Sequence, residues 1–290
     1  MKSPFQLIVK RTGRAIGDFD MIRGGDKVAV GISGGKDSLA LIMTLKELQR
    51  RAKEKYEIVP VYLSITDQPP RDTLFQFFDT LGMELKWFPS NIFQSVDAMI
   101  RERPGESPCR LCSRFRRAVL YERIKTLGCN KLALGHHLDD IIETYLLNLF
   151  FAGKIATMPP AAKAQSHDIL LIRPFVYVRE NLIIEFQQKS PIPFPDDSCC
   201  VLLPDCMSMR TVIKDWIGEL RKRDERVMDN AFAALKKHDF FREDLHKKKE
   251  SDESRRDFTA EAQRGKRTLR KKKKRLNTKA RRHKGQRDQG

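Results

Sequence analysis

At 290 residues and 40% hydrophobic content, the chain is long enough for one globular α/β domain with an appendage, and its formal net charge of +18 is unevenly distributed. It contains no apolar run of the roughly 20 residues that a membrane helix needs, and residues 1–18 lack the features of a signal peptide. We therefore expect a cytosolic protein with no membrane partner, whose six cysteines are reduced and whose closely spaced cysteines serve metal or sulfur chemistry.

A phosphate-binding loop is predicted near the beginning of the chain. Residues 1–22 read as an N-terminal helix, and Lys27–Ile32 is a short apolar run typical of a buried strand. The sequence SGGKDS, Ser33–Ser38, follows this strand and opens the next helix at Lys36. Its glycines permit a tight turn that exposes backbone N–H groups, and the helix dipole favours an anion at the same place. The alternative is a serine-glycine turn without a ligand. We call Ser33–Ser38 the phosphate loop.

The next elements predict a parallel sheet. Strands are expected at 58–63 and 83–88, with a helix at 72–81 between them and another at 91–101 after them. This alternation gives an α/β fold with an open, mostly parallel sheet and helices on both faces.

Two cysteines mark the beginning of a later helix. Cys109 and Cys112 follow a Pro/Gly loop at 103–108 and lead directly into a predicted helix that reaches Lys125. The helix dipole and the arginines of the first turns favour thiolate over thiol, which suits both metal ligation and nucleophilic sulfur. Cys129 is expected to be an ordinary buried residue.

A second polar cluster follows the predicted strand at 131–134. The segment Gly135–Asp140 reads GHHLDD and precedes a helix expected from Ile141 to Phe151. Ligands of open α/β sheets collect where the strands end, so His136, His137, Asp139 and Asp140 are expected on the same edge as the phosphate loop. We call Gly135–Asp140 the histidine-aspartate segment. A purely structural role for these residues is the alternative, and Asp140 is the preferred contact to ATP or Mg²⁺.

The remainder of the globular part is less regular. A long connection at 152–167, in which Lys154 is a candidate phosphate contact, leads to a strand at 169–172 and a helix at 179–188. Prolines make 190–206 irregular, and this stretch carries Cys199, Cys200 and Cys206. Helices are expected at 209–220 and 227–235.

The last fifty residues are strongly basic. Residues 241–290 hold 20 Lys and Arg against 8 Asp and Glu, a surplus of 12 positive charges, with few apolar residues to bury. They are predicted to be disordered in isolation. We expect an arm that pairs with nucleic-acid phosphates, and the alternative is a solvated tail that serves solubility.

These motifs together resemble one enzyme family. The sequences SGGKDS, PCRLCSRFRRAVLYE, LALGHHLDDIIET and FFAGKIATMPP occur in the order found in the tRNA-cytidine 2-sulfurtransferases, the tRNA 2-thiocytidine synthetases of the PP-loop ATP pyrophosphatases. The resemblance spans about residues 5–236. It divides the chain into the N-terminal helix at 1–22, a PP-loop ATP pyrophosphatase domain at 23–190, a cysteine-bearing loop with closing helices at 191–240, and the basic tail at 241–290.

The resemblance implies site residues and cofactors. ATP and Mg²⁺ are the expected ligands of the first site, with Asp37 on the metal, and a [4Fe–4S] cluster is expected on three cysteines. The implied catalytic residues are Asp37, Cys109 and Cys112. The implied nucleotide-binding residues are Ser33, Gly34, Gly35, Lys36, Asp37, Ser38, Gly135, His136, His137 and Asp140. The implied cluster ligands are Cys109, Cys112 and Cys200, with Cys206 and then Cys199 as alternatives to Cys200. Three ligands leave one iron open, where sulfide can bind.

The implied reaction is ATP-dependent thiolation of tRNA. The enzyme would adenylate carbon 2 of cytidine 32 in the anticodon loop and replace its oxygen with sulfur from a donor such as a cysteine desulfurase, acting as a homodimer. Zinc on four cysteines, or a persulfide without metal, is the alternative to the cluster. The alternative functions are lysidine synthesis, thiouridine synthesis, and non-catalytic RNA binding.

Overall fold

The computed structural model describes residues 2–103, 108–164, 168–192, 194 and 209–238, without the side chains of residues 109 and 110. These residues belong to one compact unit, Met1–Phe241. Its helices are α1 (Pro4–Asp18), α2 (Lys36–Arg51), α3 (Asp72–Thr80), α4 (Ile92–Glu102), α5 (Pro108–Thr126), α6 (Leu138–Phe151), α7 (Glu180–Lys189), α8 (Met209–Arg223), α9 (Val227–Lys237) and the 3₁₀ helix η1 (Pro174–Tyr177). Its strands are β1 (Lys27–Ile32), β2 (Glu57–Leu63), β3 (Lys86–Phe88), β4 (Lys131–Ala133), β5 (Ala161–Lys163) and β6 (Leu170–Ile172).

The strands of the described residues form one six-stranded sheet in the order β3-β2-β1-β4-β6-β5. All neighbouring strands are parallel except β5, which pairs antiparallel with β6 at the edge. The chain adds β2 and β3 on one side of β1, and β4 and β6 on the other side. The strand order therefore reverses between β1 and β4, and such a reversal opens a crevice at the carboxyl ends of the two strands.

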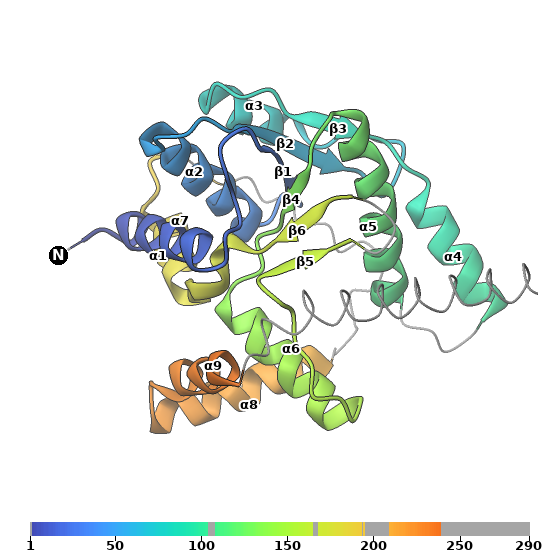
Figure 1. The fold of residues 1–290 in the computed structure, drawn as a ribbon. Coiled ribbons are helices and arrows are strands. Elements are labelled where there is room, and N and C mark those ends of the chain that lie inside the picture. The colour runs from blue at the N-terminus through green and yellow to red at the C-terminus, as the bar shows by residue number, and fades with distance from the viewer. Residues whose placement is uncertain (1, 104–107, 165–167, 193, 195–208, 239–290) are drawn as a thin grey trace, which may run out of the picture. The chain divides into compact units, whose positions relative to one another are not determined.

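Helices cover both faces of this sheet because the strand side chains alternate between two cores. Val28, Val30 and Ile32 of β1 pack in one buried cluster with α1, α2, α3 and α7, whereas Ala29 faces a second cluster with α4 and α5. Figure 1 shows α1, α2 and α7 on one side of the strands and α4 and α5 on the other, with α6, α8 and α9 together below the sheet. The predicted fold class is confirmed.

The predicted elements are present with small shifts, and two short elements were not predicted. The connection at 152–167 contains the edge strand β5, and Pro174–Tyr177 forms η1. Both are only three or four residues long, too short for a hydrophobic period to show. Helix α6 begins at Leu138, three residues earlier than expected, because His137 caps it. Among the described residues, none of the helices is long and apolar enough to cross a membrane.

Candidate active site

The phosphate loop and the histidine-aspartate segment meet at the carboxyl ends of the two central strands. The phosphate loop follows β1, the histidine-aspartate segment follows β4, and these strands are direct neighbours. The two backbones touch at one glycine: a Cβ atom at Gly135 would lie 3.0 Å from the carbonyl carbon and oxygen of Asp37 and 3.2 Å from the nitrogen of Ser38. The crevice predicted by the strand order is therefore lined by both motifs.

Hydrogen bonds within the phosphate loop hold it in shape. The Ser38 hydroxyl donates to the carbonyl oxygen of Gly35 at 2.9 Å and accepts from the backbone N–H of Ser33 at 3.2 Å. Gly34 adopts a φ of +80°, a conformation that residues with a side chain rarely adopt. Helix α2 begins directly after Gly35, and its cap lacks a side-chain hydrogen bond, so the first N–H groups of the helix remain available to an anion.

A lysine and two carboxylates face one another at this loop. The Lys36 Nζ atom lies 3.3 Å from Oδ2 of Asp37 and 3.0 Å from Oε1 of Glu180, which is the first residue of α7. Burial raises the pKa of Asp37 although the charges of His137 and Lys36 oppose this effect. The buried Oδ1 atom of Asp37 has no hydrogen-bond partner among the described residues. A buried carboxylate oxygen without a partner is unfavourable and indicates the place of a ligand.

His137 links the two motifs. Its Nδ1 atom accepts a hydrogen bond from the backbone N–H of Asp140 at 3.3 Å, and the Asp140 carboxylate accepts one from the backbone N–H of His137 at 3.0 Å. This reciprocal pair caps α6. Because Nδ1 accepts, Nε2 is the ring nitrogen left to donate, and it lies 4.0 Å from Oδ1 of Asp37, which is beyond hydrogen-bond distance. His137 therefore approaches Asp37 without forming a hydrogen bond to it.

His136 lies beside this pair in a different environment. Burial, helped by the positive charge of Arg173, lowers the pKa of His136 to about 4. Its buried Nδ1 atom has no hydrogen-bond partner among the described residues. His136 is thus a neutral imidazole at physiological pH, suited to hydrogen bonding or stacking rather than to charge pairing.

Asp139 has a positioning role. It is 5% exposed, and its carboxylate accepts hydrogen bonds from the backbone N–H of Glu180 at 2.8 Å and from Nε of Arg179 at 3.4 Å. These bonds attach the first turn of α7 to the first turn of α6. Asp139 thus lies on the predicted edge of the sheet, where it fixes Glu180 and, through Glu180, Lys36.

Helix α8 supplies two cations to the same site. Arg210 donates to Oδ1 of Asp140 at 3.3 Å, and Lys214 lies 2.8 Å from Oε2 of Glu180. Burial would raise the pKa of Glu180, but the hydrogen bonds from Lys214 and Lys36 outweigh it and lower the pKa to about 2. Glu180 therefore remains a carboxylate at any working pH and holds two ammonium groups.

A buried glutamate lies behind these residues. Glu143 of α6 is 4% exposed, and burial together with the charge of Asp140 raises its pKa to about 7. Nε of Arg210 lies 3.9 Å from Oε2 of Glu143. Glu143 is thus a carboxyl group of the site that changes its charge near neutral pH.

The cysteine pair lies in the first turn of α5. Cys109 and Cys112 are its second and fifth residues, so a spacing of three places them on one side of the helix. Leu111 between them is 5% exposed and belongs to the buried cluster that also contains Leu63 and Ile65, at the carboxyl end of β2. Because α5 leads back to the beginning of β4, its first turn lies near the carboxyl edge of the sheet, as do the phosphate loop and the histidine-aspartate segment.

The other cysteines divide into two groups. Cys129 is buried at the beginning of β4, and burial raises the pKa of its thiol, which agrees with the predicted inert role. Cys199, Cys200 and Cys206 lie outside the described residues, so the structure leaves the third cluster ligand open. Among the described residues, no three His, Cys, Asp or Glu side chains are arranged as a metal site.

The structure adds residues that sequence reasoning did not single out. Glu180, Arg210, Lys214 and Glu143 all contact or neighbour the predicted site residues, and they belong to α6, α7 and α8. For Arg210 and Lys214 the sequence does contain a signal, because a spacing of four puts both cations on one side of a helix. Lys154, the other predicted phosphate contact, is exposed.

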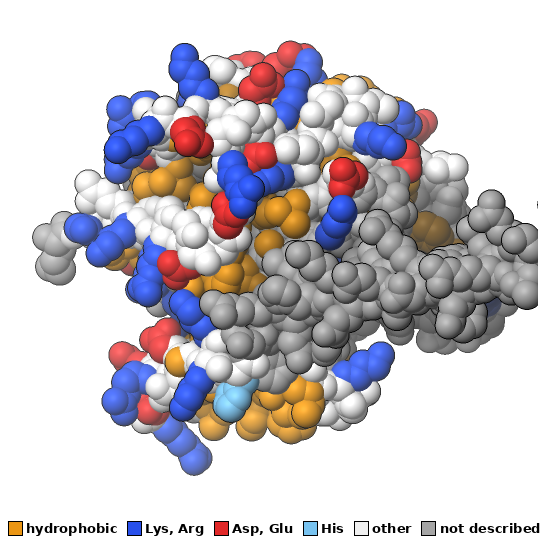
Figure 2. Space-filling model, viewed as in Figure 1, with side chains coloured by type: hydrophobic (Ala, Val, Ile, Leu, Met, Phe, Trp, Pro, Cys, Tyr) orange, Lys and Arg blue, Asp and Glu red, His pale blue; other side chains and the backbone are white. Residues whose placement is uncertain are grey.

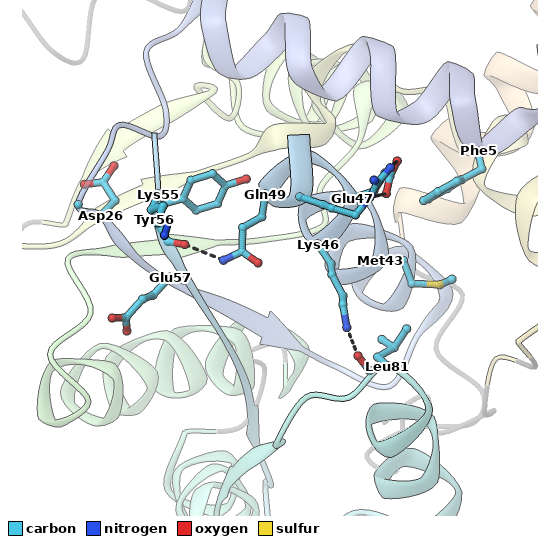
Figure 3. A pocket seen from close by; sticks show the side chains of 12 residues that line it. Phe5, Asp26, Met43, Lys46, Glu47, Gln49, Lys55, Tyr56, Glu57 and Leu81 are labelled. Atoms are coloured by element: carbon cyan, nitrogen blue, oxygen red, sulfur yellow. Dashed lines mark hydrogen bonds and ion pairs between the residues drawn. The ribbon is translucent and has the colours of Figure 1, made fainter. Parts of the chain in front are cut away.

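A separate cavity of about 780 Å³ lies at the opposite edge of the sheet. It is lined by residues of α1 and α2, by the residues that lead into β1 and β2, by Glu57 at the beginning of β2 and by Leu81 at the end of α3. Figure 3 shows Gln49 donating to the carbonyl oxygen of Tyr56 and Lys46 donating to that of Leu81 within it. Its lining includes neither the phosphate loop nor the histidine-aspartate segment. This cavity is not part of the candidate active site.

The surface seen in Figure 2 carries mixed charges. Lys and Arg side chains are interspersed with Asp and Glu over this face, and hydrophobic side chains gather at its lower end, where Figure 1 places α6, α8 and α9. Large exposed hydrophobic side chains of α6 and α8 include Phe150, Phe151, Met209 and Trp216.

Comparisons with known proteins agree with this site. The PP-loop domain model matches residues 8–201. The chain is 40% identical over 236 residues to the tRNA-cytidine(32) 2-sulfurtransferase of Geobacter sulfurreducens, covering 80% of this chain and 89% of that protein. It is 39% identical over 226 residues to that of Alkalilimnicola ehrlichii, covering 77% of this chain and 70% of that protein.

A solved structure supports the fold independently. The U34-tRNA thiolase NcsA from Methanococcus maripaludis, determined with its [4Fe–4S] cluster, superposes with a TM-score of 0.65 over 80% of each chain at 21% sequence identity. At that identity the likeness concerns the fold. The sequence relatives and the domain match place the chain in the PP-loop family and, within it, among the tRNA-cytidine(32) 2-sulfurtransferases.

Proposed function

We propose that this enzyme thiolates tRNA at cytidine 32, using ATP to activate carbon 2 of the base and replacing its oxygen with sulfur. The observation that carries the proposal is the contact between the phosphate loop and the histidine-aspartate segment, on the sheet edge near which the cysteine-bearing turn of α5 also lies. The family membership of the chain supports the choice of tRNA and of cytidine 32.

The residues present fit ATP and a divalent cation. The free N–H groups at the beginning of α2 and the Lys36 ammonium suit a polyphosphate. The buried, unpartnered Oδ1 atom of Asp37 is a hard oxygen donor of the kind that Mg²⁺ prefers, and Asp140 is a second such donor close by. The raised pKa of Asp37 falls when a cation approaches, because the cation stabilises the carboxylate. We propose that Asp37 and Asp140 hold Mg²⁺ and that Lys36 and the loop hold the phosphates.

The arrangement suits adenylation of an amide-like carbonyl. The oxygen on carbon 2 of cytosine is a poor leaving group, so its attack on the α phosphorus of ATP converts it into a phosphate ester and releases pyrophosphate. When sulfur then binds to carbon 2, the bond from carbon 2 to this oxygen breaks and the oxygen leaves as part of AMP. The phosphate loop is placed to receive that pyrophosphate, and Lys36 to neutralise its developing charge. His136, a neutral imidazole, can contact the adenine or the base by stacking and hydrogen bonding. An unpaired anticodon-loop nucleotide reaches such a crevice more easily than a paired one.

The cysteines fit a cluster by the chemistry of their thiolates. Cys109 and Cys112 lie on one side of a helix at its positive end, where thiolate is favoured over thiol. The structurally similar tRNA thiolase contains a [4Fe–4S] cluster. We propose that Cys109, Cys112 and Cys200 hold such a cluster, which supplies an iron with an open position for sulfur. Zinc held by Cys109, Cys112 and two of the three cysteines Cys199, Cys200 and Cys206 is the alternative.

The proposed reaction also needs a partner protein that delivers sulfur. A donor such as a cysteine desulfurase is proposed because each turnover consumes one sulfur atom, and assembly as a homodimer is expected. Lysidine synthesis uses the same activation but needs no cysteines, so the cysteine pair favours thiolation.

The decisive experiment is nucleoside analysis of tRNA from cells that lack the gene. Loss of 2-thiocytidine with thiouridines and lysidine intact is the expected result, and complementation with the wild-type gene should restore it. Intact 2-thiocytidine in the deletion strain would contradict the proposal, and loss of lysidine or thiouridine would reassign the substrate. ATP-dependent AMP release stimulated by tRNA separates an enzyme from a non-catalytic RNA-binding protein.

A further inference from the structure

Glu180 holds two lysines from distant parts of the chain. One carboxylate oxygen lies 3.0 Å from Nζ of Lys36 in the phosphate loop, and the other lies 2.8 Å from Nζ of Lys214 in α8. The two N–O distances and the distance between the two carboxylate oxygens add up to at most about 8 Å between the ammonium nitrogens. Two positive charges this close repel each other, and the attraction of both to the Glu180 carboxylate between them offsets this repulsion.

The shared carboxylate is itself firmly placed. The Glu180 side chain is 17% exposed, and the backbone N–H of Glu180 donates to the buried Asp139 carboxylate at 2.8 Å. Asp139 also accepts from Nε of Arg179, so the first turn of α7 is fixed against α6. Glu180 is thus a rigid support, whereas Lys214, 53% exposed, reaches it from the surface of α8.

Both lysines keep hydrogen-bonding capacity for a further anion. An ammonium group has three N–H donors, and Lys214 uses one of them on Glu180. Lys36 lies against Asp37 and Glu180, which leaves one donor of its own. The Glu180 and Asp37 carboxylates balance the charge of the two ammonium groups, so what this group of four offers a further anion at the mouth of the phosphate loop is its remaining N–H donors.

We propose that Glu180 is a positioning residue that aligns Lys36 and Lys214 as one pyrophosphate-binding pair, so that α8 contributes a second phosphate-binding lysine to the loop. This inference rests on the proposed function in that the pyrophosphate is the one released from ATP. It assigns to Lys214, 178 positions from Lys36, a direct contact with the leaving group.

Two roles of Glu180 can be distinguished: its carboxylate either occupies the place of the phosphate or aligns the two lysines that bind it. If Glu180 only occupied the place of the phosphate, its neutralisation would strengthen anion binding. If Glu180 aligns the lysines, Glu180→Gln weakens binding although it removes a negative charge, because the two ammonium groups then repel each other and move apart.

The test is calorimetric titration of the full-length protein with inorganic pyrophosphate and Mg²⁺, without tRNA or a sulfur donor. Lys214→Gln is expected to raise Kd about tenfold, the effect of losing one charged hydrogen bond, and Glu180→Gln is expected to raise it as well. Lys214→Arg, which keeps the charge, should restore most of the affinity.

The matched control is Lys222→Gln on the same helix. Lys222 is 72% exposed and pairs with Glu219 within α8, so this change removes the same charge without touching Glu180. Tighter pyrophosphate binding by Glu180→Gln, or equal Kd values for Lys214→Gln and Lys222→Gln, would overturn the proposal. Melting temperatures of all variants separate a local effect from loss of fold.

The same titration is independent of the nature of the modified nucleoside. If tRNA from the deletion strain keeps its 2-thiocytidine while Lys214→Gln still weakens pyrophosphate binding, the proposed substrate is wrong and the lysine pair stands. If thiolation is lost in the deletion strain but Lys214→Gln binds pyrophosphate as the wild type does, the pair is wrong and the proposed function stands.

Discussion

Gly135 and Asp37 are in backbone contact, although 98 positions separate them in the chain: a Cβ atom at Gly135 would lie 3.0 Å from the carbonyl carbon and oxygen of Asp37. This contact joins the ends of β1 and β4 into one site. Because the atoms in the way are backbone, an added methyl group has to displace the phosphate loop. We predict that Gly135→Ala weakens ATP binding about tenfold or more while the protein still folds.

Gly218→Ala is the control for this prediction. Apart from its chain neighbours and the backbone of its own helix, no described atom lies within 4 Å of a Cβ at Gly218 in α8, so alanine should stabilise the helix by about 0.5–1 kcal/mol. Titration with ATP and thermal melting distinguish the two variants. Equal ATP affinity in both would show that the contact at Gly135 does not shape the loop.

The paired cysteines should separate sulfur chemistry from adenylation. We predict that Cys112→Ser abolishes 2-thiocytidine formation and the broad absorption near roughly 400 nm expected of anaerobically purified protein, while ATP binding is retained. Cys129→Ala, at a buried and inert thiol, should keep the absorption and the activity. Zinc in place of iron in the purified wild-type protein would contradict the cluster assignment.

Glu143 predicts a pH dependence of stability. Its pKa is about 7 in the folded protein against an ordinary value of 4.5, so the folded state binds more protons between these values and loses stability as pH rises through them. At one pKa unit per about 1.4 kcal/mol, the effect is at most roughly 3 kcal/mol. Glu143→Gln, which is always neutral, should therefore raise the melting temperature relative to wild type at pH 8.

The same comparison at pH 4 to 5 supplies the control for Glu143. There the wild-type side chain is protonated in the folded protein, so the two melting temperatures should converge. A constant difference at both pH values would mean that the substitution acts through packing and not through ionisation.

A buried ion pair where β1 and β4 begin should matter for stability. Nζ of Lys131 lies 2.7 Å from Oδ2 of Asp26, and the two side chains are 9% and 10% exposed. Asp26→Ala leaves a buried ammonium group without its counter-charge and is expected to cost about 3–5 kcal/mol in denaturant unfolding. Glu57→Ala, which removes the exposed partner of Lys27, should cost less than about 1 kcal/mol. Similar losses of unfolding free energy for Asp26→Ala and Glu57→Ala would show that water solvates the Lys131 ammonium group once Asp26 is removed.

The basic C-terminal segment predicts salt-dependent tRNA binding. Residues 241–290 carry a surplus of 12 positive charges, and cations that neutralise phosphates release counterions. Truncation after residue 240 should weaken tRNA binding at low salt and flatten the plot of log K against log salt, with little change in ATP binding. An unchanged slope would favour a tail that serves solubility alone.

The local sequence was sufficient for the elements that carry the phosphate loop. An apolar, β-branched run, two glycines and a helical period define β1, the turn and α2 within 25 residues, because strand propensity, glycine conformation and helix periodicity are all local properties. The position of the histidine-aspartate segment on the same edge followed from a general rule of parallel sheets.

The tertiary structure alone decided which charges meet at that edge. Lys36 and Glu180 are 144 positions apart, and nothing in the sequence around Glu180 distinguishes it from an ordinary first residue of a helix. Asp139 and Asp140 are neighbours of the same type, yet one anchors α7 and the other pairs with Arg210. The side chains of successive helix residues point about 100° apart, so Asp139 and Asp140 face different neighbouring helices. Which helices pack around α6 is determined by how the whole chain buries its hydrophobic core, and a local stretch of sequence does not contain that information.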